Sequence, residues 1–100
     1  EVESVLHEGE GRRVRFRLPR ELSRFVAEKG SLAIDGASLT VARCVGQTCE
    51  IAYIPHTLRV TVAGEYDPGR AINIEVDVIA RYVARLLEGA EAARGEASHP

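Results

Sequence analysis

Two small hydroxyl side chains and a carboxylate lie close together in the sequence, and their spacing suits ligand binding. Ser38 and Thr40 are two residues apart in a segment of alternating polar and apolar residues, so both hydroxyls share one face of a strand. Asp35 precedes them in a turn, Lys29 comes shortly before that turn, and Thr57 begins a later helical turn. Such a surface could hydrogen-bond a polyol and the amide edges of a heterocycle. From these residues alone, an exposed and solvated sheet face is the simpler interpretation.

The two cysteines do not form a zinc site, because no paired Cys or His ligands accompany Cys44 and Cys49. If Gly46 and Gln47 form a two-residue hairpin loop, the cysteines lie directly opposite each other on adjacent strands. That arrangement approaches the separation of a disulfide, although we expect both thiols to stay reduced. The histidines are scattered, and the sequence has no Walker loop, dinucleotide fingerprint or serine–histidine–acid arrangement. We expect no metal and no cofactor.

Short strands joined by tight turns are the elements that must position these residues. Residues 13–18 alternate Arg with Val, Phe and Leu, which predicts a half-buried strand with a solvated arginine face. The Asp35-Gly36 pair is typical of a hairpin turn between strands at 31–34 and 37–45. Further strands are expected at 1–7, 48–54 and 71–77, and short helical segments between Pro19 and Gly30 and over 56–60.

A repeated apolar pattern near the end of the chain predicts a helix over residues 78–90, followed by a flexible tail at 91–100. Its apolar stripe consists of Ile79, Val83, Leu86 and Ala90, at intervals of four, three and four residues. A helix this short is marginal alone in water, so we expect its own domain or partner helices to cover the stripe. Together with about six short strands, this pattern predicts an all-β fold, namely a small antiparallel barrel.

Length and composition fit one globular domain and exclude two classes of partner. The 100 residues are 45% hydrophobic and 28% charged, with a net charge of −2. Nucleic acid is not an expected partner, because the chain lacks the basic excess that phosphate binding requires. No apolar run reaches the ~18 residues of a membrane span and no signal peptide is visible, so we expect a cytoplasmic protein without membrane contact. The chain has no Met, so we expect it to be a piece of a longer protein.

Three stretches of the sequence resemble the lumazine-binding repeat of riboflavin synthase. They are 29–41 (KGSLAIDGASLTV), 54–58 (IPHTL) and 72–77 (INIEVD), the last running into the terminal helix. Their common order and spacing make the resemblance specific. Ser38 stands where the first of the family's two repeats usually carries Cys, and a long helix follows, so the chain resembles the second, C-terminal repeat. Residues 1–77 would then form one barrel repeat, whose first strand is expected to precede Glu1.

The resemblance implies a fold, an activity and an assembly. The fold is a six-stranded antiparallel Greek-key barrel with short helical insertions and a C-terminal oligomerisation helix. The activity is a transfer of a four-carbon unit between two molecules of 6,7-dimethyl-8-ribityllumazine, which gives riboflavin and 5-amino-6-ribitylamino-pyrimidinedione without a cofactor. The assembly is a homotrimer with each active site between barrels of neighbouring subunits. The isolated chain would therefore be inactive.

The same resemblance assigns roles to individual residues. Ser38 and Thr40 are the candidate catalytic residues and would contact the pteridine. The candidate substrate-binding positions are Lys29, Asp35, Gly36, Ile54, Thr57 and Asp77. The chemistry suits such side chains, because the substrate's 7-methyl group is already acidic and the protein mainly has to orient its ligands. Two other functions stay open: a non-catalytic lumazine or flavin carrier, and an oligomerisation module that binds no ligand.

Overall fold

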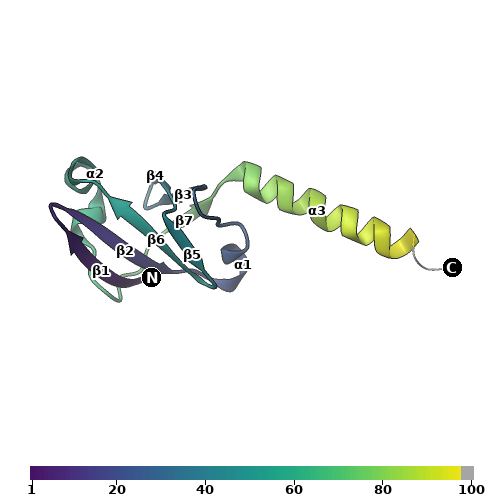
Figure 1. Cartoon of the computed structure of the whole chain (residues 1–100), viewed down its shortest axis with the longest axis horizontal. Coiled ribbons are helices and arrows are strands. Elements are labelled where there is room, and N and C mark those ends of the chain that lie inside the picture. Colours follow the sequence, from purple (N-terminus) through teal and green to yellow (C-terminus); the bar gives the residue numbers. More distant parts are fainter. Residues whose placement is uncertain (98–100) are drawn as a thin grey trace.

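The structure is a computed structural model that describes residues 1–97, and strands and short helices alternate along most of that length (Figure 1). The strands are β1 (Val2–Glu8), β2 (Gly11–Arg17), β3 (Ser31–Ile34), β4 (Ala37–Thr40), β5 (Arg43–Val45), β6 (Thr48–Tyr53) and β7 (Ile74–Val76). The helices are α1 (Arg20–Ser23), α2 (Pro55–Val60), the 3-10 helix η1 (Val62–Glu65) and α3 (Val78–Ala97). Most of the predicted elements are therefore present, with the differences described below.

The strands pair into two antiparallel sheets that share one core. The larger sheet has the order β1-β2-β6-β5, and the smaller sheet has the order β4-β3-β7. Residues from both sheets form a single buried cluster, so the all-β class expected from the sequence is confirmed. No ladder of hydrogen bonds joins the two sheets within residues 1–97, so the described strands do not close into one ring.

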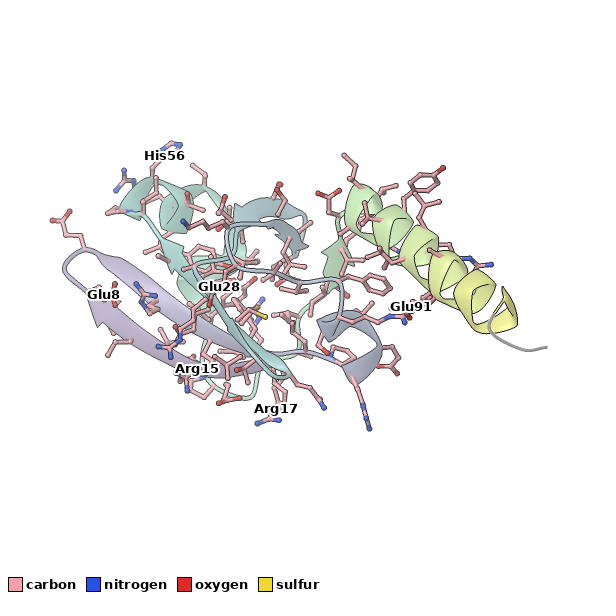
Figure 2. All side chains as sticks on the ribbon, turned by 45° about the vertical axis from the view of Figure 1, so that its right-hand side comes forward. Glu8, Arg15, Arg17, Glu28, His56 and Glu91 are labelled. Atoms are coloured by element: carbon pink, nitrogen blue, oxygen red, sulfur yellow. The ribbon has the colours of Figure 1, made fainter. Side chains whose placement is uncertain are left out.

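β2 shows most directly how the residue pattern builds the core. Val14 and Phe16 are fully buried, while Arg13 and Arg15 point to the opposite face, as the alternation predicts. On that outer face the Arg15 guanidinium lies 2.8 Å from the Glu50 carboxylate, and this hydrogen bond lowers the pKa of Glu50 (Figure 2). The arginine face is thus neutralised by acidic neighbours. The rest of the buried core consists of Val2, Leu18, Val26, Leu32, Ile34, Val41, Cys49, Ile51, Tyr53, Ala63, Tyr66 and Val76.

The segment predicted as one strand over residues 37–45 is divided between the two sheets. β4 pairs with β3, whereas β5 pairs with β6. Between them the Val41 amide donates to the Gly30 carbonyl, and the Ala42 amide donates to the Glu50 carbonyl. These two hydrogen bonds hold the chain where it crosses from the smaller sheet to the larger one. They join residues far apart in sequence, and the local alternation of polar and apolar residues does not reveal them.

The helix predicted between Pro19 and Gly30 is reduced to α1 at its start. The Lys29 amide donates to the Val41 carbonyl at 2.7 Å, and the Gly30 carbonyl accepts from the Val41 amide at 2.9 Å. The end of this segment therefore bonds to Val41, directly after β4, and the helix does not continue to Gly30. Val26, which lies within this segment, is nevertheless buried in the core.

α3 extends away from the two sheets and gives the molecule a length of 61 Å (Figure 1). Its first turn is fixed by Asp77, whose carboxylate accepts a hydrogen bond from the Ile79 amide at 2.9 Å. Such a cap satisfies one of the free amides that every helix start carries. Among the helices of the described chain, none combines the length and the apolar character that crossing a membrane requires.

α3 is longer than the sequence pattern predicts. It passes residue 90 and reaches Ala97, so residues 91–97 of the expected flexible tail are helical. Gly89 does not end the helix, because one interior glycine costs only about 1 kcal/mol and the neighbouring alanines favour helix strongly. Residues 98–100 of the expected tail lie outside the described residues.

The apolar stripe of α3 is not covered by the two sheets. Ile79 is 72% exposed and Leu86 is 57% exposed. On another face of the helix, the Glu88 carboxylate accepts a hydrogen bond from Arg24, which follows α1. The helix therefore contacts the segment after α1 through a pair of charged residues, while its apolar stripe stays exposed to solvent.

We expect Phe16→Ala to lower the free energy of unfolding by about 3–5 kcal/mol, because it empties the centre of a fully buried site. Leu6→Ala is the matched control, since Leu6 is an exposed residue on the neighbouring strand β1. Urea denaturation followed by circular dichroism measures both variants. Equal losses for the two would contradict the position of the core.

Candidate functional site

The two candidate catalytic hydroxyls lie on the outer face of the smaller sheet. Ser38 on β4 is paired with Ala33 on β3, which is in turn paired with Glu75 on β7. In the adjacent row of the same face, Thr40 is paired with Ser31. Ser38 and Thr40 are both exposed. The sheet therefore presents hydroxyls on one side, short side chains in the middle and a carboxylate on the other side.

A shallow hollow of about 340 Å³ lies on this face, and it brings together Ser38 and Asp77. Its other walls are Ser31, Leu32, Ala33, Glu75, Val76 and Val78. Because Ser31 and Ala33 have short side chains, they leave space between β4 and β7 that a flat ring could occupy. Asp77 contributes one carboxylate oxygen to the cap of α3, which fixes its position at the edge of the hollow.

Asp35 is held more firmly than any other candidate residue. It occupies the first position of the β3–β4 turn with φ 49°, followed by Gly36 with φ 84°, as a tight hairpin turn requires. Its carboxylate accepts hydrogen bonds from the Tyr66 hydroxyl at 2.5 Å and from the Asn73 backbone amide at 2.9 Å. Asp35 therefore ties the turn to the residue that follows η1 and to the residue that precedes β7.

These contacts determine the pKa of the Asp35 carboxyl group. Partial burial raises the pKa of Asp35, but the hydrogen bonds from Tyr66 and Asn73, aided by the positive charge of Arg70, outweigh burial and lower the pKa overall. Burial, and then the hydrogen bond to Asp35, raise the pKa of Tyr66. At neutral pH the pair is thus a charged carboxylate and a neutral phenol that donates to it.

A second hollow of about 390 Å³ lies between this turn and the α2–η1 segment. Asp35, Gly36 and Ala37 form one side, and Thr61 lies on the other with Val60 and Val62. The Thr61 hydroxyl donates to the carbonyl of Thr57 at 2.7 Å. Thr57 itself is half-buried in the first turn of α2 and contributes to neither hollow.

Lys29 and Ile54 lie outside both hollows. Lys29 is exposed, has φ 65° and is bonded through its backbone to Val41, directly after Thr40. Ile54 is 62% exposed and precedes the helix that Pro55 begins. Ile54 instead lines a separate hollow beside the β1–β2 turn, together with Glu8 and Arg12, so the candidate residues do not form a single enclosed cavity.

Sequence reasoning did not identify Tyr66 as part of this region. Its hydroxyl meets a carboxylate 31 positions earlier in the chain, and no local pattern signals such a contact. The residue type alone could have indicated a partner, because the hydroxyl of a buried tyrosine usually forms a hydrogen bond. In the described part of the chain, no three His, Cys, Asp or Glu side chains gather closely enough to hold a metal ion. The side chains on this face can orient a polar ligand through hydrogen bonds.

We expect Tyr66→Phe to lower the free energy of unfolding at pH 7 by about 1.5–3 kcal/mol, because a hydrogen bond to a charged group is lost. The folded-state pKa of Asp35 is lowered, so its contribution is complete above the unfolded pKa, about 4, and is lost as the pH falls through the folded value. The difference between variant and wild type should therefore shrink below about pH 4.

Urea unfolding between pH 7 and pH 3 measures this difference. Tyr82→Phe removes the same hydroxyl from an exposed tyrosine and should change little at any pH. A loss for Tyr66→Phe that stays constant with pH would contradict the role of the Asp35 carboxylate.

Comparison with known proteins places this chain in a family. A model of the lumazine binding domain matches residues 1–77. A riboflavin synthase from Brucella abortus (strain 2308) is 46% identical over 90 residues, which cover 88% of this chain and 45% of that protein. A riboflavin synthase from Photobacterium phosphoreum is 42% identical over 72 residues, which cover 72% of this chain and 33% of that protein. The chain thus spans less than half the length of these relatives.

Solved structures of LumP have the same fold. LumP in complex with flavin mononucleotide superposes with a TM-score of 0.72 at 20% identity, covering 76% of this chain and 43% of that one. LumP in complex with 6,7-dimethyl-8-(1'-D-ribityl) lumazine gives a TM-score of 0.69 at 23% identity, covering 75% and 41%. The resemblance inferred from three short motifs is confirmed by these independent comparisons. With its family match over residues 1–77, this chain belongs to the lumazine-binding domain family.

Proposed function

We propose that this chain is the C-terminal lumazine-binding repeat of a riboflavin synthase. The observation that carries the proposal is 46% identity over 90 residues to a protein of that name. The parent enzyme would transfer a four-carbon unit between two molecules of 6,7-dimethyl-8-ribityllumazine, giving riboflavin and a pyrimidinedione. The two free thiols of Cys44 and Cys49 suit a cytoplasmic location, where thiols stay reduced.

In this proposal the outer face of the smaller sheet receives the pteridine ring of one lumazine. Ser38 and Thr40 are exposed there and have hydroxyls free to donate or accept hydrogen bonds. Backbone groups near Gly36 and Ile54 would meet the amide edges of the ring. The ribityl chain would reach the remaining candidate positions, which are Lys29, Asp35, Thr57 and Asp77.

The proposed chemistry needs orientation more than reactive side chains. The 7-methyl group of the lumazine transfers a proton to a general base and becomes a carbanion whose charge spreads into the ring. Hydroxyl donors such as Ser38 and Thr40, held where that charge develops, lower the barrier to its formation. A second lumazine must then lie against the first, because the four-carbon unit passes between them. No cofactor takes part in this scheme.

The openness of the site supports a partner surface. The hollow beside Ser38 is shallow, and the hydroxyls face solvent. A single lumazine-binding repeat can thus bind one face of a ligand, while a second repeat from a neighbouring subunit would supply the other face.

We expect the 100-residue chain alone to bind the lumazine but to form no riboflavin, measured by riboflavin absorbance.

The proposed homotrimer rests on α3. Its apolar stripe is exposed along the helix, with Val83 at 47% and Leu87 beside it at 59%. Spacings of four, three and four residues match the seam of a short coiled coil. Association of three copies through this seam would bury the stripe and place the barrels of neighbouring subunits side by side.

We expect Thr40→Val to weaken binding of 6,7-dimethyl-8-ribityllumazine by about 1 kcal/mol, or about fivefold, because it keeps the side-chain shape and removes one hydrogen bond. Ser38→Ala should have an effect of the same size. Ser4→Ala is the control, since it removes an exposed hydroxyl from β1 in the other sheet. Ligand fluorescence titration gives the three dissociation constants. Unchanged binding in both site variants, with wild-type affinity in the control, would rule out this placement of the ring.

Leu86→Glu should dissociate the proposed trimer, because it places an unpaired charge in each of three symmetric positions of the seam. Arg85→Glu places the same side chain at the neighbouring position, outside the stripe and in a groove between α3 and Phe25, and should leave assembly intact although it changes the charge twice as much. Sedimentation velocity at micromolar concentration compares the two variants. A Leu86→Glu chain that sediments like the wild type would show that α3 does not mediate assembly.

A further inference from the structure

The two cysteines form a directly opposed pair on adjacent strands. β5 and β6 are joined by the two-residue turn Gly46-Gln47, and their register places Cys44 opposite Cys49. The pairing predicted from the sequence is therefore confirmed. Both side chains lie on the inner side of the larger sheet, where Cys49 is buried and Cys44 is half-buried.

The hairpin geometry favours a bond between the two sulfurs. In a hairpin with a two-residue turn, the residues that flank the turn exchange hydrogen bonds, and here they are Val45 and Thr48. The next pair, Cys44 and Cys49, is then a non-hydrogen-bonded pair, the type in which the strands come closest. Opposed Cβ atoms lie about 4.5–5.5 Å apart, against about 3.5–4.5 Å in a disulfide. A small inward movement of the hairpin closes the bond, and the resulting strain makes it easy to reduce.

The two thiols differ in accessibility, which sets the order in which they react. Burial, as the largest cause, raises the pKa of Cys49 to about 12, so this thiol stays protonated and shielded. Cys44 is nearer the surface, and its thiol makes only a weak hydrogen bond of 3.5 Å to the Val26 carbonyl. A neighbouring bond links its amide to the carboxylate of Glu28 (Figure 2). An oxidant from solution therefore meets Cys44 first.

We propose that Cys44 and Cys49 are a reversible oxidation site that closes to an intramolecular disulfide. The oxidant is a low-molecular-weight disulfide such as oxidised glutathione. The Cys44 thiolate attacks one of its sulfurs, forms a mixed disulfide and releases one glutathione thiolate. Cys49 then loses its proton to water and attacks the Cys44 sulfur, which releases the second glutathione. Two protein thiols are oxidised and one glutathione disulfide is reduced to two glutathiones.

The second step has a distinct physical character. Because Cys49 must be deprotonated in a buried position, the ring closes slowly compared with attack at an exposed thiol. The closure also removes the thiol donor from the Val26 carbonyl, in the loop that leads to β3. Reduction reverses both changes, and the strain of the opposed pair favours it.

The test is incubation of the chain with oxidised glutathione, followed by tryptic digestion and mass spectrometry. Both cysteines fall in the single peptide of residues 44–59. We expect this peptide to become about 2 Da lighter, the mass of two hydrogens, while the protein stays free of intermolecular dimer. Dithiothreitol should restore the original mass. A stable glutathione adduct on the wild type, or dimers alone, would overturn the proposal.

Two single variants separate the roles of the cysteines. Cys49→Ser should accumulate the glutathione adduct on Cys44, because the resolving thiol is missing. Cys44→Ser should leave Cys49 unmodified in the folded chain, and modified only after unfolding in urea. Equal modification of Cys49 in the folded Cys44→Ser variant would show that the order of attack is wrong. Circular dichroism of each variant establishes that it is folded.

Discussion

The carboxylate of Asp35 is the point on which the geometry of the candidate site depends. The turn between β3 and β4 requires two consecutive positive φ angles, and only Gly36 adopts one without strain. Hydrogen bonds from Tyr66 and Asn73 hold the other in place. Because β4 starts directly after this turn, the same bonds set where Ser38 and Thr40 emerge on the outer face. A single anion, held by donors from distant parts of the chain, thus fixes the edge of the smaller sheet.

Around Asp35, the inner faces of the sheets form the core and the outer faces are exposed to solvent. The inner faces of both sheets carry most of the buried side chains, and Tyr66, which follows η1, packs between them: its ring meets that of Phe16 edge to face, with centroids 5.7 Å apart. The outer face of the larger sheet is occupied by pairs such as Arg15 and Glu50. The outer face of the smaller sheet carries short side chains and hydroxyls, and it is the surface on which a flat ligand finds space.

The sequence predicted features that depend on neighbouring residues. The Asp35-Gly36 turn, the alternation of β2 and the register of the β5–β6 hairpin follow from local rules and are all present. The division of residues 37–45 between two sheets and the shortened helix after Pro19 were missed, since both depend on bonds to Val41 and Glu50 across the fold. For the site, the motif resemblance located the hydroxyl face, but the partnership of Asp35 and Tyr66 needed the folded chain.

The exposed stripe of α3 would link the helix content of this chain to its concentration if copies associate as proposed. Within residues 78–91, whose side chains the structure describes, α3 contributes no side chain to the buried core, so folding of the sheets gains no core packing from them. An assembly that covers the stripe requires α3 to be helical. By mass action, the helix content of α3 would then rise with protein concentration. Dilute and concentrated solutions of the same chain would therefore differ in helix content while their sheets stay identical. In the proposed assembly, thermal unfolding of the sheets would thus be independent of protein concentration, whereas thermal unfolding of α3 would depend on it.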